Sequence, residues 1–242
     1  MPKGKADPEA VPFSKLDGQF LVIEEKVDGT GVCLFFDDNL DPQIWHRGST
    51  AIGKEFKQLH NFFNHNQERF LDILEDRYVM FGEYMLYKHT IFYDRLPHLF
   101  LESDIYDRKN NIWLSTNARY NLLSKHSDYI RQVPVIATMK PSALRRIIDL
   151  VGKPLYQTEK WRLSLWDNCI KYNQPLDKVL EQTDQSGLME GLYIKHEDDN
   201  EVLGRYKYVR FEFVENIINS GTHLIDRKPI YNLVNGGCGD WS

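Results

Sequence analysis

EKVDGTG, residues 25–31, lies between two short apolar runs, QFLVI at 19–23 and GVCLFF at 31–36. β-Branched and aromatic runs that are joined by a polar, glycine-containing segment are typical of two strands connected by a turn. The two glycines allow a positive φ or the close approach of a ligand. A lysine followed by an acid and by glycines is an unusual composition for a surface turn, so Lys26 is the first candidate for chemistry.

The rest of the chain contains further strand-like and helical runs. Short apolar runs predict strands, and apolar residues at helical spacing predict helices. The predicted strands cover 78–86, 98–106, 192–196 and 202–213. The predicted helices cover 56–74, 118–123, 142–151 and 158–172. Strands, a helix, strands, helices and strands in this order predict an α+β domain with largely antiparallel sheets.

The length of 242 residues suits one large domain with short appendages. Residues 1–12 hold three of the ten prolines and few apolar residues, so we expect an N-terminal tail there. We expect the domain over residues 13–214 and a short C-terminal extension over residues 215–242. After Arg210 only 32 residues remain (242 − 210), which is too few for an OB-fold barrel.

Composition argues against several classes of protein. Hydrophobic residues make up 42% of the chain and charged residues 27%, as in ordinary globular domains. No uninterrupted apolar run approaches the roughly 20 residues that cross a bilayer, so no membrane is expected as a partner. Cys33, Cys169 and Cys238 show no CxxC spacing, which argues against a disulfide framework or a zinc cluster. Residues 1–13 carry no apolar secretory signal, so we expect a cytoplasmic protein.

The net charge of −5 gives no general attraction to nucleic acid, yet cations are concentrated in two places. GRYKYVR, residues 204–210, holds three cations and two tyrosines without an acid, and KPSALRR, residues 140–146, holds three more cations. In a strand, Arg205 and Lys207 point to the same face. Each stretch is therefore either a solvated face or a local binding surface for anions.

A nucleophilic lysine must lose its proton before it can react. With a reference pKa near 10.4, only a few amines in ~10⁴ are neutral at pH 7, a handicap of about 4.6 kcal/mol. Nearby cations or a hydrated metal ion lower that pKa. Taken alone, the pattern Lys26-x-Asp28-Gly29 also fits a turn with a solvated lysine.

Lys26 does not stand alone, because further short blocks follow it in order. They are Arg47-Gly48, Phe81-Gly82-Glu83-Tyr84, Asp104-Ile105-Tyr106, Glu190-Gly191-Leu192-Tyr193-Ile194-Lys195 and Arg205-Tyr206-Lys207. Their order and spacing resemble the covalent nucleotidyltransferase superfamily of DNA ligases, RNA ligases and mRNA capping enzymes. Lys26-Val27-Asp28-Gly29 is similar to motif I of that superfamily, and the later blocks, apart from Arg47-Gly48, are similar to its motifs III, IIIa, IV and V.

Within the superfamily, EGLYIK at 190–195 and RYKYVR at 205–210 look most like ATP-dependent RNA ligases of the RNA-repair type, in particular small stand-alone bacterial members. The resemblance implies a nucleotidyltransferase fold, in which two antiparallel sheets flanked by helices hold the nucleotide in the cleft between them. It implies that Lys26 attacks the α-phosphorus of ATP and forms lysyl-AMP. AMP would then pass to the 5′-phosphate of an RNA end, and the 3′-hydroxyl of another end would displace it. The implied partners are these RNA ends and a separate end-healing kinase/phosphatase.

The resemblance also assigns roles around the phosphates. Arg205 and Lys207 would hold the α-phosphate, and their positive field would favour the neutral amine of Lys26. Glu83 would accept a hydrogen bond from a ribose hydroxyl. Glu190, together with Glu83, would bind Mg²⁺ or Mn²⁺.

Further positions would complete the nucleotide site. Glu24, or the backbone of Glu25, would contact the adenine amino group. Arg47 would contact the ribose or the 5′-phosphate. Asp28 and Gly29 belong to motif I and are expected at the nucleotide as well; an alternative for Asp28 is that it orients the loop instead of contacting the nucleotide.

Ser103 and Arg205 depart from the superfamily pattern, whereas Lys195 agrees with it. An aromatic residue usually precedes the motif IIIa aspartate and stacks on adenine, but Ser103 stands there, so Phe100 or Tyr106 would take its place. Motif V usually begins with lysine, and Arg205 keeps the charge while changing the geometry. Lys195 matches motif IV and is expected to bind the nucleotide.

Simpler interpretations stay open for several of these residues. Glu83 and Glu190 also fit buried ion pairs, Arg47 fits a surface position, and Lys195 fits a sheet edge. For function, one alternative is a related nucleotidyltransferase with another acceptor, of the capping or DNA ligase type. The other is a non-catalytic module that binds RNA ends, although the intact set of charged residues argues against it.

Overall fold

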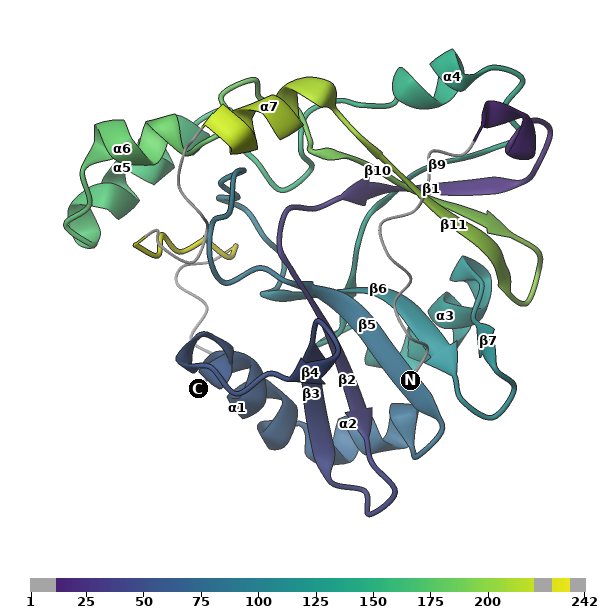
Figure 1. Cartoon of the computed structure of the whole chain (residues 1–242). Coiled ribbons are helices and arrows are strands. Elements are labelled where there is room, and N and C mark those ends of the chain that lie inside the picture. Colours follow the sequence, from purple (N-terminus) through teal and green to yellow (C-terminus); the bar gives the residue numbers. More distant parts are fainter. Residues whose placement is uncertain (1–11, 220–227, 236–242) are drawn as a thin grey trace.

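The computed structural model describes residues 12–219 and 228–235, and in this part of the chain two β-sheets are surrounded by helices (Figure 1). Sheet A has four strands and lies above the seven-stranded sheet B in the view of Figure 1. The strand pairs are antiparallel, except that β6 (Phe100–Asp107) pairs in parallel with β8 (Arg131–Gln132). The predicted α+β class with largely antiparallel sheets is confirmed.

Sheet A has the strand order β11–β10–β1–β9. Its strands are β1 (Leu21–Lys26), β9 (Val135–Met139), β10 (Gly191–Glu197) and β11 (Val202–Val209). The β-branched residues of the Leu-Val-Ile run suit a strand that is covered on both sides, and five of the six residues of β1 are buried. Strand β1 continues beyond this run, so Lys26 is its last residue and does not lie in a longer polar turn.

Sheet B has the order β4–β3–β2–β5–β6–β7, with β8 on a side path. Its other strands are β2 (Thr30–Phe36), β3 (Pro42–His46), β4 (Ser49–Thr50), β5 (Tyr78–Tyr84) and β7 (Ile112–Trp113). Side chains alternate between the two faces of a strand. Leu34, Met80 and Ile105 therefore share the face that is packed into the largest hydrophobic core.

The α-helices of the described residues are α1 (Lys57–His65), α2 (Gln67–Leu74), α3 (Thr116–Leu123), α4 (Leu144–Ile148), α5 (Trp161–Lys171), α6 (Leu176–Glu181) and α7 (Phe211–Asn219). Short 3₁₀ turns form at Phe13–Lys15, Lys54–Phe56 and Ser124–His126. The single helix predicted over 56–74 is in fact two helices. They are separated at Asn66, whose side-chain amide donates a hydrogen bond to the carbonyl of Phe62 at 2.9 Å.

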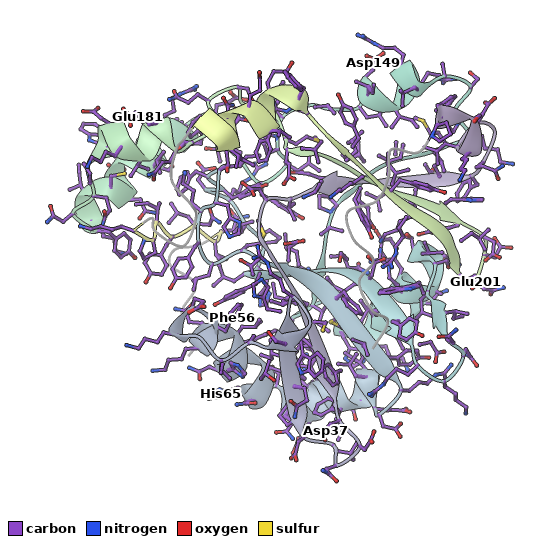
Figure 2. All side chains as sticks on the ribbon, in the orientation of Figure 1. Asp37, Phe56, His65, Asp149, Glu181 and Glu201 are labelled. Atoms are coloured by element: carbon purple, nitrogen blue, oxygen red, sulfur yellow. The ribbon has the colours of Figure 1, made fainter. Side chains whose placement is uncertain are left out.

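Each sheet packs one face against a hydrophobic core. The other faces of the two sheets are turned toward the space between them. Helices α1 and α2 cover sheet B with Leu59, Phe63 and Phe70 in the large core. A smaller core covers the face of sheet A that carries Leu21 and Ile23. Figure 2 shows the tips of the β2–β3 and β10–β11 hairpins, marked by Asp37 and Glu201, and side chains from both sheets in the space between the layers.

The described part of the C-terminal region is built into the domain. The side-chain amide of Asn232 donates to the carbonyl of Met85 at 2.8 Å and accepts from the N–H of Tyr93 at 3.0 Å. Helix α7 runs across the boundary that we expected between residues 214 and 215. Residues 1–11, 220–227 and 236–242 lie outside the described part. Among the helices of residues 12–219, none is long and apolar enough to cross a bilayer.

Candidate active site

A cleft of about 730 Å³ lies between the two sheets. Of the residues predicted for the site, those that line it are Glu24, Glu25, Lys26, Arg47, Glu83, Arg205 and Lys207. The predicted residues outside its lining are Asp28, Gly29, Phe100, Glu190 and Lys195. The lining also includes residues to which the sequence analysis gave no role at the nucleotide, namely Cys33, Trp45, Phe81, Val133 and Tyr193.

The register of sheet A explains which side chains face the cleft. Strand β10 pairs with β1 on one side and with β11 on the other, so side chains form rows across the sheet. The rows on this face are Val22, Lys195 and Arg205, then Glu24, Tyr193 and Lys207, then Lys26, Gly191 and Val209. A side chain at Gly191 would collide with the carbonyl oxygen of Tyr208, so the position beside Lys26 must stay small.

Lys26 forms an ion pair with Glu190, the residue that precedes β10. The Lys26 Nζ and Glu190 Oε1 atoms are 2.5 Å apart. Burial lowers the pKa of Lys26, but attraction by Glu190, Glu83 and Asp28 outweighs it and raises the pKa overall. The expectation that cationic neighbours favour the neutral amine does not agree with this raised pKa, because carboxylates dominate the surroundings of Lys26.

Glu83 and Glu190 are carboxylates whose pKa values are raised in the site. Burial raises the pKa of Glu83 to about 8, with Lys26 opposing the shift. Burial, together with repulsion by Asp28, raises the pKa of Glu190 to about 7. Bringing a cation close to these groups would favour their charged forms.

The same two carboxylates fit a divalent cation. Mg²⁺ usually binds one or two carboxylates and completes its shell with phosphate and water oxygens. The described residues contain no group of three or more His, Cys, Asp or Glu side chains that could hold a metal ion. Glu83 and Glu190 would therefore need oxygens from a nucleotide and from water to complete the shell.

Arg47 reaches the cleft from a tight turn. It lies with Gly48 between β3 and β4, at φ 49° and 80° respectively. Two-residue hairpin turns favour such left-handed conformations because their twist matches that of the strands. The turn presents the exposed Arg47 at the rim of the cleft, where the sequence placed it.

Asp28 and Gly29 support the loop after Lys26. The Asp28 carboxylate accepts hydrogen bonds from the backbone N–H groups of Thr90 and Ile91, at 2.7 and 2.8 Å. Gly29 has no positive φ; an added Cβ would lie 2.5 Å from the sulfur of Met85. Both residues thus fix the end of β1 against residues 85–91 of the same chain. Neither of them lines the cleft, although we had expected both at the nucleotide.

A buried ion network lies directly behind the cleft. Lys195 is fully buried, with its Nζ 3.0 Å from Glu24 and 3.1 Å from Asp104. Arg119 of α3 is also fully buried and donates to Glu24 at 2.8 Å and to Glu102 at 2.9 Å. The expectation that Lys195 binds the nucleotide is therefore wrong in this structure, because its amine is enclosed by carboxylates.

Sequence reasoning missed Arg119, although a signal existed. Arg119 shares the buried face of α3 with Thr116 and Leu123, at a spacing of three and four residues. A cation on the apolar face of a helix must find buried carboxylates, since an unpaired buried charge is very costly.

The aromatic residues of the cleft differ from those predicted. Phe100 is fully buried, and its ring packs so closely on Gly82 that an added Cβ would lie 2.7 Å from it. The prediction that Phe100 stacks on adenine is therefore wrong. Tyr193 lines the cleft instead, and its hydroxyl donates to Asp104 at 3.3 Å. Tyr106 lies outside the lining.

Glu25 turns its side chain to the other face of sheet A. Its carboxylate accepts a hydrogen bond from the N–H of Leu155 at 2.9 Å, and burial raises its pKa to about 7. Because neighbouring residues of a strand alternate, Glu24 and Lys26 face the cleft while Glu25 borders it through its backbone.

A family model described as RNA ligase matches residues 19–209. This range includes all strands of both sheets and every residue that lines the cleft. None of the curated proteins has a sequence that matches the chain.

Solved structures of an RNA ligase from Naegleria gruberi share the fold. A variant with ATP and Mn matches with a TM-score of 0.55 and 16% identity, covering 88% of this chain and 57% of that one. The same ligase with PPi matches with a TM-score of 0.56 and 17% identity, covering 83% and 52%. A variant with AMP and Mn gives 0.53 and 16%, covering 84% and 53%. The chain thus spans little more than half the length of these relatives, and at this identity the likeness concerns the fold.

Proposed function

Because the chain belongs to the RNA ligase family, we propose that it is an ATP-dependent RNA ligase. It joins a 5′-phosphate RNA end to a 3′-hydroxyl end through lysyl-AMP at Lys26 and an adenylylated 5′ end. One observation carries the proposal. Lys26 ends β1 at the cleft and pairs with Glu190 at 2.5 Å, while Glu83, Arg205 and Lys207 line the walls of the cleft.

The cleft suggests how ATP would lie. Tyr193 offers a ring to the adenine beside Glu24, and the backbone of Glu25 borders the same end. Glu83 would accept a hydrogen bond from a ribose hydroxyl. Arg205 and Lys207, two residues apart on β11, would hold the α-phosphate in front of Lys26. The buried cations Lys195 and Arg119 would act indirectly, by fixing the carboxylate of Glu24.

In the first step, the deprotonated amine of Lys26 attacks the α-phosphorus of ATP. The nitrogen–phosphorus bond forms, the bond to the bridging α–β oxygen breaks, and pyrophosphate leaves. Displacement at phosphorus depends mostly on positioning and on neutralising charge, which Arg205 and Lys207 supply. A divalent ion held by Glu83 and Glu190 would neutralise phosphate charge and weaken the hold of Glu190 on the proton of Lys26.

In the second step, an oxygen of the RNA 5′-phosphate attacks the phosphorus of lysyl-AMP and frees Lys26. In the third step, the 3′-hydroxyl of the other end attacks the RNA 5′-phosphorus, and AMP leaves. Arg47 at the rim of the cleft would contact the 5′-phosphate or the ribose. A cytoplasmic location and a separate end-healing kinase/phosphatase stay predictions.

The proposal is tested by incubating the protein with [α-³²P]ATP and Mg²⁺ in the absence of RNA. Wild type should gain a covalent label, and Lys26→Ala should not. Lys125→Ala, which removes a lysine from the 3₁₀ turn after α3, should label like wild type. Label from GTP instead of ATP would favour a capping-type enzyme, and RNA binding without any label would favour a non-catalytic module.

A further inference from the structure

An aromatic layer covers the face of sheet B that is turned toward the cleft. It consists of Trp45 on β3, Phe81 on β5, Tyr106 on β6 and Trp113 on β7. Cys33 of β2 pairs with both Trp45 and Phe81, and Tyr106 pairs with Trp113. Directly paired residues share a face of the sheet, so the rings lie side by side across it.

The four rings of the aromatic layer are only partly buried, and three of them are in contact. The centroids of Phe81 and Trp113 are 4.9 Å apart, and those of Tyr106 and Trp113 are 5.1 Å apart. Trp45, Phe81 and Tyr106 pack on Cys33, Phe35 and Val79, all of them strand residues. The rings thus rest on a rigid sheet and keep area open to a partner.

Cations flank this aromatic layer. The guanidinium of Arg205 lies 3.6 Å from the centroid of the Trp113 ring, and Arg205 also lines the cleft. Arg47 follows Trp45 by two residues at the opposite edge. The guanidinium of Arg108 lies 5.8 Å from the centroid of the Phe35 ring, which is on the same face of the sheet. Rings between positive charges suit a ligand that has flat faces and a negatively charged backbone.

From these contacts we propose that the aromatic layer binds the unpaired terminal nucleotides of the RNA strand whose 5′-phosphate enters the cleft. Aromatic rings on a sheet bind single strands by stacking with bases, while cations follow the backbone. In a duplex the base faces are already covered by their neighbours, so the layer would select unpaired ends. From β3 to β7 the sheet extends over four strand spacings, roughly 19 Å, which is room for a few nucleotides.

This inference rests on the proposed function and specifies where its RNA substrate lies. It is tested by binding of a 5′-phosphorylated single-stranded RNA with a 3′ fluorophore, followed by fluorescence anisotropy at fixed salt. Trp113→Ala should weaken binding about tenfold, the effect of one lost base stack. The matched control is Trp166→Ala on α5, which removes a tryptophan of 49% exposure and should leave binding unchanged.

A second position separates lost stacking from lost folding. Tyr106→Leu keeps an apolar side chain but removes the ring, and it should weaken binding. Tyr106→Phe keeps the ring and loses only the hydroxyl, and it should bind like wild type. Urea unfolding of each variant confirms that the protein is folded under the assay conditions.

RNA that lacks the bases of its first nucleotides identifies the contact. Wild type should bind this RNA at least as weakly as Trp113→Ala binds normal RNA, and Trp113→Ala should bind the RNA without bases no more weakly than wild type does. If Trp113→Ala and Tyr106→Leu bind normal RNA as well as Trp166→Ala does, the inference is wrong. The inference is also wrong if Trp113→Ala and Tyr106→Leu weaken binding of the RNA without bases, or of blunt duplex RNA, by the same factor as they weaken binding of normal single-stranded RNA.

ATP labelling of the same variants keeps the two proposals apart. Tyr106→Leu should gain label from ATP like wild type, because this step uses no RNA and Tyr106 lies outside the lining of the cleft. Normal labelling with unchanged RNA binding would overturn only the inference. Absence of label in wild type, with RNA binding that depends on Trp113, would overturn the ligase proposal and support the RNA surface.

Discussion

Lys26 Nζ lies 2.5 Å from Glu190 Oε1, so the candidate nucleophile is held in an ion pair. Burial lowers the pKa of the amine, but the surrounding carboxylates outweigh this and raise it. The amine would become reactive when other cations occupy the carboxylates and a phosphate enters between Lys26 and the pair Arg205 and Lys207. The ion pair thus favours the protonated form of Lys26. We expect the contact between Lys26 and Glu190 to be lost when the nucleotide binds.

Glu190→Gln removes the negative charge that we propose binds a divalent ion. We expect at least a tenfold slower labelling by [α-³²P]ATP at a fixed Mg²⁺ concentration, roughly the range seen for weakened metal sites. Raising the Mg²⁺ concentration should recover part of the rate. Glu181→Gln, at the exposed end of α6, serves as the control. Equal rates for the two variants would show that Glu190 has no part in the reaction.

Lys207→Ala removes one of the two cations of β11 that line the cleft together with Lys26. Removing one well-placed donor from a site of developing charge typically slows a reaction about 100-fold, and we expect a loss of that order in the rate of labelling. Arg145→Ala removes a cation from α4 whose side chain is 81% exposed, and it should label at the wild-type rate. A Lys207→Ala protein that labels as fast as this control contradicts the assignment of the α-phosphate site.

Lys195→Met tests the buried ion network behind the cleft. The substitution preserves much of the side-chain volume but leaves Glu24 and Asp104 buried without their shared cation. Breaking a buried pair in this way costs about 3 to 5 kcal/mol of the free energy of unfolding, measured by urea denaturation. Lys153→Met breaks an exposed pair with Glu159 and should cost less than about 1 kcal/mol. Similar losses in both variants would refute a supporting role for Lys195.

Glu25→Gln should change how stability depends on pH. Burial raises the pKa of Glu25 from 4.5 to about 7, so the folded protein holds this proton more tightly than the unfolded chain. The contribution of Glu25 to the free energy of unfolding therefore falls as pH rises from about 4.5 to 7. Above pH 7 the full cost is on the order of 3 kcal/mol.

Glutamine retains an oxygen that can accept the N–H of Leu155 but carries no charge. Relative to wild type, Glu25→Gln should thus gain stability steadily between pH 5 and pH 8 in urea unfolding. Glu68→Gln, an exposed substitution on α2, should show no such trend. The free energy of unfolding of Glu25→Gln minus that of wild type should thus differ between pH 5 and pH 8. An equal difference at pH 5 and pH 8 would contradict the raised pKa of Glu25.

Local sequence patterns predicted most of the sheet framework. The predicted strands at 78–86, 98–106 and 192–196 correspond to β5, β6 and β10 within a few residues. Because these strands are largely buried, their sequences are rich in apolar residues, and this composition is enough to predict them as strands. The patterns failed where a few residues decide the outcome, as in the helix that breaks at Asn66 and in the two-residue strand β4.

For the site, the sequence predicted which side chains of one strand share a face, but not which of them are enclosed by other elements. Alternation places Arg205 and Lys207 on one face of β11, and the structure confirms this placement. It does not tell that Lys195 is enclosed, because that depends on Arg119 and Glu24, which are 95 residues apart in the sequence. Phe100 was misplaced for the same reason, since the packing of β5 against β6 decides which aromatic ring stays open.

The central claim is that the amine of Lys26 carries AMP, and mass spectrometry of the protein after incubation with ATP and Mg²⁺ tests it most directly. We expect the intact mass to increase by one AMP, and peptide mapping to place this AMP on Lys26. Addition of 5′-phosphorylated RNA should then return the protein to its unmodified mass. A chain that stays unmodified, or that carries AMP on another lysine such as Lys207, would contradict the account.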